Sequence, residues 1–367
     1  MSLNLQVFNN SVTRLGVVDV ITGLTWEEKF ADAGNFELWC PVNDQNIDLL
    51  QEDNLLWIGG DSAGLIEFKE LTSDDEGTQT IHVQGRTCEC YLDFRTIYPR
   101  IVTSGKVSAV MRKLLTDHVI SPSDTNRVIP GIELDSSQTV LGSSISFQRT
   151  GDTVLLACSD LGQSHALGFK LKFIPQSKKF IFQIYQGTNR TVDQTATTPV
   201  LFSSELDDIL ESTYSHNKSD YKNVAYTAGE GEGSDRQVVS TGTATGLNRR
   251  ELFVDARDLQ STADDGSTIS SSEYTAMLVE RGKSKLEDYK DIKTFSATVR
   301  TFGVTSYTYG KDFQLGDTVT VYDARLKVQV NAMVTAAMKT FDEDGERLDI
   351  TFGYSQPTLA NKLRRMV

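Results

Sequence analysis

The chain has 367 residues, of which 50 are Asp or Glu and 36 are Lys or Arg, so its formal net charge is −14. A chain this acidic is not expected to have DNA or lipid headgroups as its main ligand, because both carry negative charge. No run of residues approaches the roughly 18 apolar positions that a membrane helix needs. The length fits two to four domains, and the composition is globular with a bias toward β-structure.

Residues 3–100 are predicted to be mostly strands. Short alternating runs bounded by turn residues indicate an antiparallel barrel or sandwich. The expected strands cover residues 5–8, 16–21, 24–30, 36–40, 55–58, 65–71 and 78–85. One brief helical pattern, at residues 43–50, follows Pro41.

The pattern then changes to alternating helices and strands. Apolar residues recur at helical spacing over 106–119 and again over 151–161, where Gly162 fits a helix stop. Strand-like runs at 168–174 and 180–185 are separated by a turn at 177–179. This middle segment is predicted to be a separate α+β domain.

Residues 206–245 return to β character, interrupted by a glycine-rich acidic segment at 228–235. That segment is expected to be an exposed, flexible loop, and its carboxylates lack the ligand order of an EF-hand. A helix is predicted to follow. Ser270 and Glu273 form a capping box, and Tyr274, Met277 and Leu278 lie on one helical stripe.

The last sixty residues carry the clearest hairpin signals. Alternating strands at 318–322, 326–338 and 347–352 are separated by turns, the second of which ends in Gly345. A similar turn ends in Gly77, and in both places another glycine follows eight residues later, at Gly85 and Gly353. Two β units of related architecture are therefore expected, although the inward-facing positions differ in phase by one residue.

One serine stands in a motif that is typical of esterases. Gly60-Asp61-Ser62-Ala63-Gly64 matches the G-x-S-x-G pattern, which requires a strand-to-helix turn and a histidine partner. Here the following residues 65–71 alternate like a strand. A hairpin turn is the preferred interpretation, and a serine esterase using Ser62 remains the alternative.

Other chemistry is sparse. The four histidines have no catalytic or metal-binding spacing, and Cys88 and Cys90 do not form a zinc pattern. We therefore predict no catalytic residue, no cofactor-binding or metal-binding residue, and no enzyme activity. A carbohydrate-binding receptor module is a further alternative, which would require exposed aromatic side chains over a groove.

Several stretches resemble the tail-tip (baseplate) hub proteins of siphophages, which are related in architecture to the hub of contractile phage tails. The resemblance covers most of the chain in order. The stretches that carry it are Trp26-Glu27-Glu28-Lys29-Phe30, Gly34-Asn35-Phe36-Glu37-Leu38-Trp39-Cys40-Pro41, residues 66–95, residues 222–251, residues 309–317 and Ile350-Thr351-Phe352-Gly353-Tyr354.

The resemblance implies two β-barrels with two insertions, in a homotrimer whose six barrels form a ring. It places the first barrel at 1–103, an inserted α+β domain at 104–205, the second barrel at 206–248 with 292–356, a helical insertion at 249–291 and a tail at 357–367. It implies a structural virion protein that contacts other tail-tip and tail-tube proteins. DNA would pass through the ring without specific binding.

Overall fold

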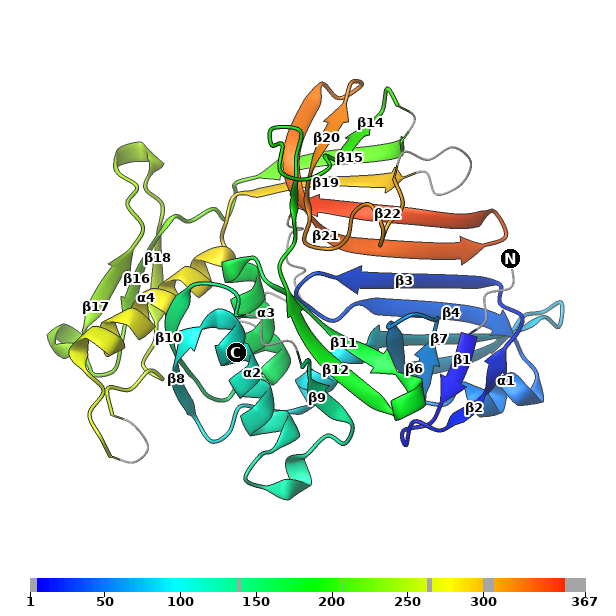
Figure 1. The fold of residues 1–367 in the computed structure, drawn as a ribbon, viewed down its shortest axis with the longest axis horizontal. Helices are drawn as coiled ribbons and strands as arrows, with labels where there is room; N and C mark the ends of the chain where they lie inside the picture. Colours follow the sequence, from blue (N-terminus) through cyan, green and yellow to red (C-terminus); the bar gives the residue numbers. More distant parts are fainter. Residues whose placement is uncertain (1–4, 137–139, 207, 263–265, 300–306, 354–367) are drawn as a thin grey trace.

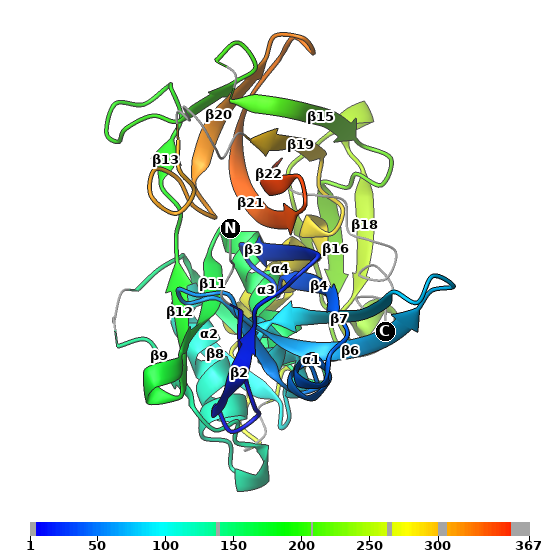
Figure 2. The same ribbon diagram turned by 90° about the vertical axis from the view of Figure 1, so that its right-hand side faces the viewer.

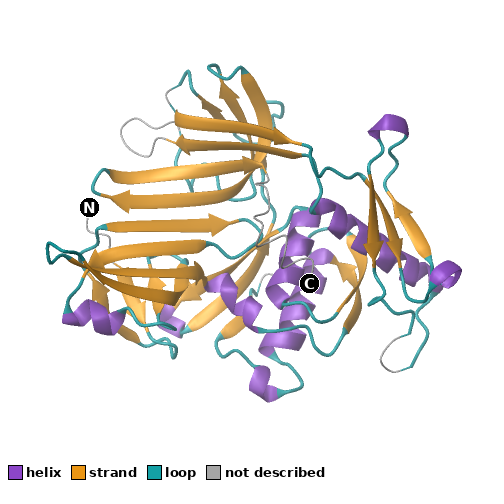
Figure 3. Cartoon of the chain, turned by 180° about the vertical axis from the view of Figure 1, so that it is seen from behind, coloured by secondary structure: helices purple, strands orange, loops and turns teal. Residues whose placement is uncertain are grey.

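The computed structural model describes residues 5–136, 140–206, 208–262, 266–299 and 307–353. Strands are the main regular structure of the described chain and pair mostly antiparallel, in one sheet of 14 strands and three small sheets. Figures 1 and 3 show the strands of the large sheet side by side on one flank and the longer helices on the other. The predicted α+β, mainly β class is confirmed in this respect.

The N-terminal part of the large sheet contains seven strands in the order β3-β4-β7-β6-β5-β1-β2. Buried and open positions alternate along β4 and β7, so that one face covers a core built around Trp26 and Phe36, whose rings stack 5.0 Å apart. The elements are β1 (Leu5–Phe8), β2 (Arg14–Val18), β3 (Gly23–Lys29), β4 (Asn35–Pro41), α1 (Asp44–Leu49), β5 (Leu55–Trp57), β6 (Ala63–Ser73) and β7 (Gln79–Thr87).

A middle segment packs beside this sheet. Its two-stranded and three-stranded sheets, β10-β8 and β11-β12-β9, lie with helices α2 and α3 around a shared apolar core. The elements are a 3-10 helix (Cys88–Phe94), β8 (Ile101–Lys106), α2 (Val107–Leu115), a π-helical turn (Thr116–Ile120), a 3-10 turn (Thr125–Arg127), β9 (Ile132–Leu134), β10 (Ser144–Arg149), α3 (Val154–His165), β11 (Gly168–Ile174), a 3-10 turn (Pro175–Ser177), β12 (Lys179–Tyr185), β13 (Asn189–Arg190) and β14 (Leu201–Ser203).

The sequence predicted that helix α3 ends at Gly162, but the helix continues past this residue. It continues to His165 and ends at Ala166, which has a left-handed backbone with φ of 51°. Gly162 serves close packing instead, because a Cβ there would lie 2.6 Å from the carbonyl oxygen of Leu167 and 2.9 Å from Ala31.

The C-terminal part of the large sheet repeats the strand order of the N-terminal part. It comprises β15 (Ile209–Asn217), β19 (Ile292–Val299), β20 (Thr318–Asp323), β21 (Val328–Asp342) and β22 (Gly345–Gly353), and the short strands β13 and β14 pair in parallel with β20. Reading across the sheet, β15-β19-β22-β21-β20 follows the same chain-order pattern as β3-β4-β7-β6-β5. We call β3 to β7 the first strand set and β15 with β19 to β22 the second strand set.

Matching β-bulges give the alignment of the two sets. In the β6–β7 hairpin the register shifts between Ile66 and Phe68, and in the β21–β22 hairpin it shifts between Val334 and Ala336. Bulges re-aim a strand and are specific features rather than defects. With the bulges superimposed, Gly85 is equivalent to Phe352 and not to Gly353, which accounts for the one-residue phase difference in the sequence.

The two strand sets are joined edge to edge within the chain. The second half of β21 pairs with β3 in antiparallel register, from Ala336 opposite Lys29 to Phe341 opposite Leu24. Figure 1 shows β22, β21, β3 and β4 as neighbouring ribbons. Among the described strands the hydrogen-bonded order runs from β15 to β2 without joining its ends. Neither predicted barrel is therefore closed by hydrogen bonds in this part of the chain.

A third region projects from the second strand set. Strands β16 (Val224–Ala228), β17 (Val238–Thr241) and β18 (Glu251–Asp255) form one small sheet, with 3-10 turns at Gly233–Asp235 and Gly246–Asn248. Helix α4 (Ser271–Glu287) packs on it, and the hydroxyl of Ser270 accepts the Glu273 N–H, as the predicted capping box requires. Strand β16 thus pairs with β17 and with β18 of the predicted insertion, rather than with the second strand set.

Candidate functional site

The sequence-predicted Ser62 lies in a polar cleft between the first strand set and the middle segment. The cleft has a volume of about 790 Å³. Its walls come from β3, the β5–β6 turn, β11, β12 and the segment around Tyr309; residues lining it include Glu28, Lys29, Asp61, Ser62, Lys170, Lys172, Tyr185 and Tyr309.

The G-x-S-x-G segment is a hairpin turn, as preferred from the sequence. Strands β5 and β6 are antiparallel, with Trp57 opposite Ala63. The hydroxyl of Ser62 accepts a hydrogen bond from the indole N–H of Trp26 at 3.0 Å. Ser62 thus satisfies the buried indole N–H of Trp26. The chain around Ser62 does not form the strand-to-helix turn of a nucleophile elbow.

The four histidines lie elsewhere in the described chain, and three of them contact a carboxylate. His82 stacks on Trp39 and contacts Glu37 at 3.2 Å, His165 contacts Glu280 at 2.7 Å, and His216 contacts Asp291 at 2.6 Å. His118 is buried at the end of the helix that begins with α2. None of the hydrogen bonds described for Ser62 involves a histidine, so the structure offers no support for the esterase alternative.

The ionisable groups of the cleft are paired with one another. Asp61 contacts Lys170 at 3.0 Å and Lys172 at 3.7 Å. Burial opposes ionisation of Asp61, but the two lysines outweigh it and hold the pKa of the carboxyl below its usual value. The Tyr309 hydroxyl donates to Glu28 at 3.2 Å, and burial together with that carboxylate raises the pKa of Tyr309.

The cysteines are packing residues. All four are buried, and none is in a disulfide. Burial raises the pKa of the Cys40 thiol to about 11 and that of Cys90 further, which keeps both protonated at neutral pH. No group of three or more His, Cys, Asp or Glu that could hold a metal ion occurs among the described residues.

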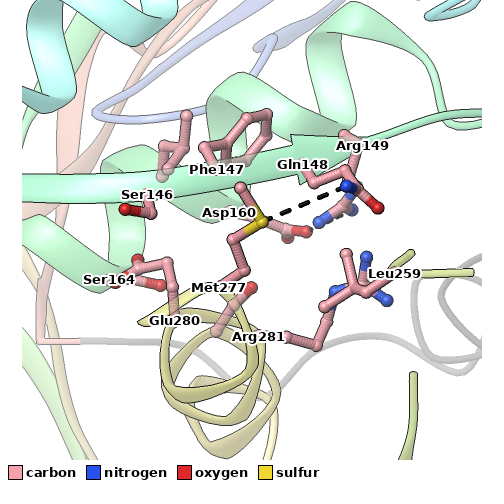
Figure 4. A pocket seen from close by; sticks show the side chains of 12 residues that line it. Ser146, Phe147, Gln148, Arg149, Asp160, Ser164, Leu259, Met277, Glu280 and Arg281 are labelled. Carbon is pink, nitrogen blue, oxygen red and sulfur yellow. Dashed lines mark hydrogen bonds and ion pairs between the residues drawn. The ribbon is translucent and has the colours of Figure 1, made fainter. Parts of the chain in front are cut away.

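A second, much smaller cavity marks the contact between the middle segment and α4. Figure 4 shows Gln148 and Arg149 of β10 facing Met277, Glu280 and Arg281 of α4. The buried guanidinium of Arg149 pairs with Asp160 of α3 at 2.7 Å and with Asp152 at 2.5 Å. Because these charges neutralise one another, the cavity is a polar joint between packed elements.

The large sheet has several strand edges that are hydrogen-bonded on one side only, among them β2 at one end, β15 at the other end and the second half of β6. Strand β5 and the preceding residues Asp53 and Asn54 cover β6 as far as Ile66, and the rest of β6 pairs only with β7. Strand β15 is the last strand of the sheet and pairs only with β19. Phe68 and Leu71 on the free half of β6 are 44% and 53% exposed. Figure 2 shows the β6–β7 hairpin extending away from the body of the molecule.

The large sheet has an open face on the side away from the Trp26 core. In the first strand set it is formed by the positions that alternate with buried ones, including Thr25, Glu27, Lys29, Glu37, His82, Gln84, Arg86, Glu70 and Thr72. Its basic groups are paired with acids: Lys29 with Glu27 at 3.2 Å, and Arg86 with Glu67 at 2.7 Å. The basic groups at these positions are therefore paired, and the open face is polar apart from Trp39 and Phe68, whose rings contact the His82 ring.

An antiparallel sheet built from two strand sets of one order, with free edges and no assembled catalytic centre among the described residues, is typical of a structural component. Comparison with known proteins identifies the class as phage tail proteins. The chain belongs to the Siphovirus ReqiPepy6 Gp37-like protein family, whose model matches residues 4–354. No curated protein matches the sequence.

Solved phage tail structures share the fold. A tail protein from Neisseria meningitidis MC58 is 14% identical, with a TM-score of 0.57 over 96% of both chains. The 43 kDa tail protein of prophage MuSo2 from Shewanella oneidensis is 12% identical, with a TM-score of 0.58 over 95% of this chain and 98% of that one. Prophage tail protein gp18 from Listeria monocytogenes EGD-e is 10% identical, with a TM-score of 0.55 over 99% and 98%.

The family assignment confirms the predicted relationship to phage tail proteins, which are virion components. Within the described residues no helix is long and apolar enough to cross a membrane. The free edges of β6 and β15 were not predicted from the sequence. They depend on which strands pair, and no local sequence pattern specifies the β3–β21 pairing. The paired bulges could have been sought by aligning the two hairpins.

Proposed function

We propose that this protein is the hub of a siphophage or prophage tail tip, in which three copies form a ring that connects the tail tube to the distal tip. The observation that carries the proposal is the edge-to-edge junction of two strand sets with the same order. The β3–β21 pairing joins the first strand set to the second within one chain. The same type of strand pairing can join strand sets of different chains. Three copies would then supply six strand sets.

The charge of the chain supports passage of DNA through such a ring. A channel lined by unpaired Lys and Arg would hold phosphates strongly, whereas neutral or acidic walls would let them pass. Besides Trp39 and Phe68, the open face carries mainly Thr, Ser, Asn, Gln and charged side chains, among them the pair of Arg347 with Asp342 at 2.6 Å. We propose that this face lines the channel, and that the ring contacts the tail-tube and tail-tip proteins at its two ends.

We propose the domain division that the family resemblance implies, with one boundary changed. The first barrel-like domain is 1–103, the inserted α+β domain is 104–205, and the second barrel-like domain contains 206–217 with 292–356. We assign residues 218–291 to the second insertion, because β16, β17, β18 and α4 pack together. The tail at 357–367 lies outside the described residues.

Light scattering on concentrated protein tests the assembly, and a low-resolution envelope tests its shape. We expect a species of three copies with a central channel. A stable monomer in purified tails, or a ring whose channel is lined by unpaired lysine and arginine, would contradict the hub assignment.

A further inference from the structure

We propose that the free half of β6 in one copy pairs with the free edge of β15 in the next copy, as an antiparallel extension of the large sheet, with Thr72 opposite Thr213. This inference rests on the proposed ring and adds which strands join the copies and in which register.

The β21–β3 junction within the chain is the template. The shared strand order makes β6 equivalent to β21 and β15 equivalent to β3. Strand β21 uses its first half to pair with β20 and its second half to pair with β3. Strand β6 likewise uses its first half to pair with β5, but its second half has no second strand beside it among the described residues.

The register follows from the ladders. The bulges align Phe68 with Ala336, and therefore Ser73 with Phe341. Val83 and Ile350 are equivalent, and they pair with Leu38 and Ala297, so Leu38 is equivalent to Ala297. Leu38 pairs in turn with Leu24, and Ala297 with Ser212. Leu24 is therefore equivalent to Ser212.

Because Phe341 lies opposite Leu24 within the chain, Ser73 should lie opposite Ser212 of the next copy. Counting outward from that pair places Thr72 opposite Thr213, Leu71 opposite Tyr214 and Phe68 opposite Asn217.

The side chains suit this pairing. Thr340 lies opposite Thr25 in the internal junction, and the transferred register again places threonine opposite threonine. Leu71, which is 53% exposed, would lie beside the half-buried ring of Tyr214. Glu70 would face Ser215, so no carboxylate faces another across the new pair. Aromatic and apolar side chains that lie opposite each other stabilise an antiparallel strand pair.

The two edges differ from each other, which determines the kind of assembly. A contact between the β6 edge of one copy and the β15 edge of another is heterologous, so every added copy presents a further free edge until a ring closes. Unpaired strand edges are also the usual places where sheets of separate chains join.

The internal junction also indicates which pairs suit a disulfide. The N–H of Phe30 donates to the carbonyl of Thr335 at 2.9 Å, so Phe30 and Thr335 are a hydrogen-bonded pair. Hydrogen-bonded and non-hydrogen-bonded pairs alternate along an antiparallel ladder, so Thr25 and Thr340 are a non-hydrogen-bonded pair. The equivalent pair between copies, Thr72 and Thr213, should then be non-hydrogen-bonded as well. Such pairs have Cα atoms about 4.5 Å apart, within the range of a disulfide.

Oxidative cross-linking of the full-length variant Thr72→Cys/Thr213→Cys tests the register. The four native cysteines are buried, so the introduced thiols are the accessible ones. We expect covalent dimers and trimers on non-reducing gels. The matched control, Thr72→Cys/Ser215→Cys, is displaced by two residues to a separation of about 7–8 Å, and should cross-link about tenfold less.

A proline at Leu71 tests the pairing without cysteines. In the transferred alternation the Leu71 N–H points toward the free edge and not toward β7, so Leu71→Pro should keep the intrachain ladder and the melting temperature close to the unmodified protein. It should abolish the three-copy species in light scattering, whereas Leu71→Ala, which keeps the N–H, should retain it.

The results separate this pairing from the hub itself. A three-copy species that forms without the Thr72–Thr213 cross-link, or that survives Leu71→Pro, would overturn the pairing and leave the hub standing. Equal cross-linking of the displaced pair would overturn the register. A chain that stays monomeric and uncross-linked at high concentration would overturn the pairing, while cryo-electron microscopy of intact tails would decide the hub role separately.

Discussion

The indole N–H of Trp26 donates to the hydroxyl of Ser62 across 3.0 Å and thereby ties β3 to the turn before β6. Trp26 is fully buried. Its N–H has to find an acceptor within the protein, because an unsatisfied buried donor costs about 1–3 kcal/mol.

Replacing Ser62 by alanine is expected to lower the free energy of unfolding by about 1–3 kcal/mol, because the Trp26 N–H loses its acceptor. Chemical denaturation measures this change, and Ser62→Thr, which keeps a hydroxyl, is the matched control. Hydrolysis of a nitrophenyl ester should be at the background rate in all three proteins. Hydrolysis by the unmodified protein that disappears in Ser62→Ala would revive the esterase alternative.

Replacing Gly85 by alanine should destabilise the first strand set severely. A Cβ at this position would lie 1.9 Å from the Leu65 carbonyl oxygen and 2.6 Å from the Phe36 ring, so the β6–β7 ladder must shift. We expect a loss above about 3 kcal/mol, in the range of severe core disruption. Gly77→Ala is the comparison.

At Gly77 the space for a Cβ is open and only the positive φ of 86° is strained, which costs roughly 1–2 kcal/mol. Thermal unfolding followed by circular dichroism ranks the two variants. A smaller effect at Gly85 than at Gly77 would contradict the close packing of β7 on Phe36.

Acid should weaken the contact between β15 and the end of β20 through Asp323. This buried carboxylate accepts hydrogen bonds from Arg325, from the Ser212 hydroxyl at 2.5 Å and from the Leu326 N–H. These bonds, those of Arg325 first, hold the pKa of Asp323 far below its usual value. A lowered folded pKa contributes stability above the unfolded value near 3.8, and that stability is lost as pH falls below it.

Asp323→Asn should therefore lower stability at pH 7 by roughly 2 kcal/mol and flatten the fall of stability below about pH 4. Urea unfolding at a series of pH values measures both effects. Asp342→Asn is the control and should change little, because Asp342 is a turn carboxylate whose side chain is partly exposed, whereas that of Asp323 is fully buried. An unchanged acid dependence in Asp323→Asn would show that Asp323 does not carry it.

Replacing Arg149 by methionine should cost about 3–5 kcal/mol, because Asp160 and Asp152 would lose their buried counter-charge. Adding Asp160→Leu should recover part of the loss, since the remaining site becomes more apolar. Denaturation of the single and double variants gives the coupling free energy. Additive effects would mean that the two side chains act independently despite their 2.7 Å separation.

Local signals predicted the elements whose cause is local. The Ser270 cap and the turn at Gly345 are short-range chemistry, and the structure forms both. The junction of β3 with β21 and the parallel pairing of β16 with β18 join distant residues, and no local pattern specifies such partners. The turn at Ser62 is a local feature that the sequence predicts. Its hydrogen bond with Trp26, 36 residues away, has no local pattern.

Placing both strand sets on one polypeptide has a kinetic consequence. The β3–β21 contact is intramolecular, so its two strands meet at a fixed effective concentration, of the order of millimolar for a tethered pair, whatever the amount of protein in the cell. In the proposed ring of six sets, only three joins would then depend on encounters between molecules. In dilute subunits, the three joins within the chains would already be formed. The three joins between chains would then control assembly of the ring.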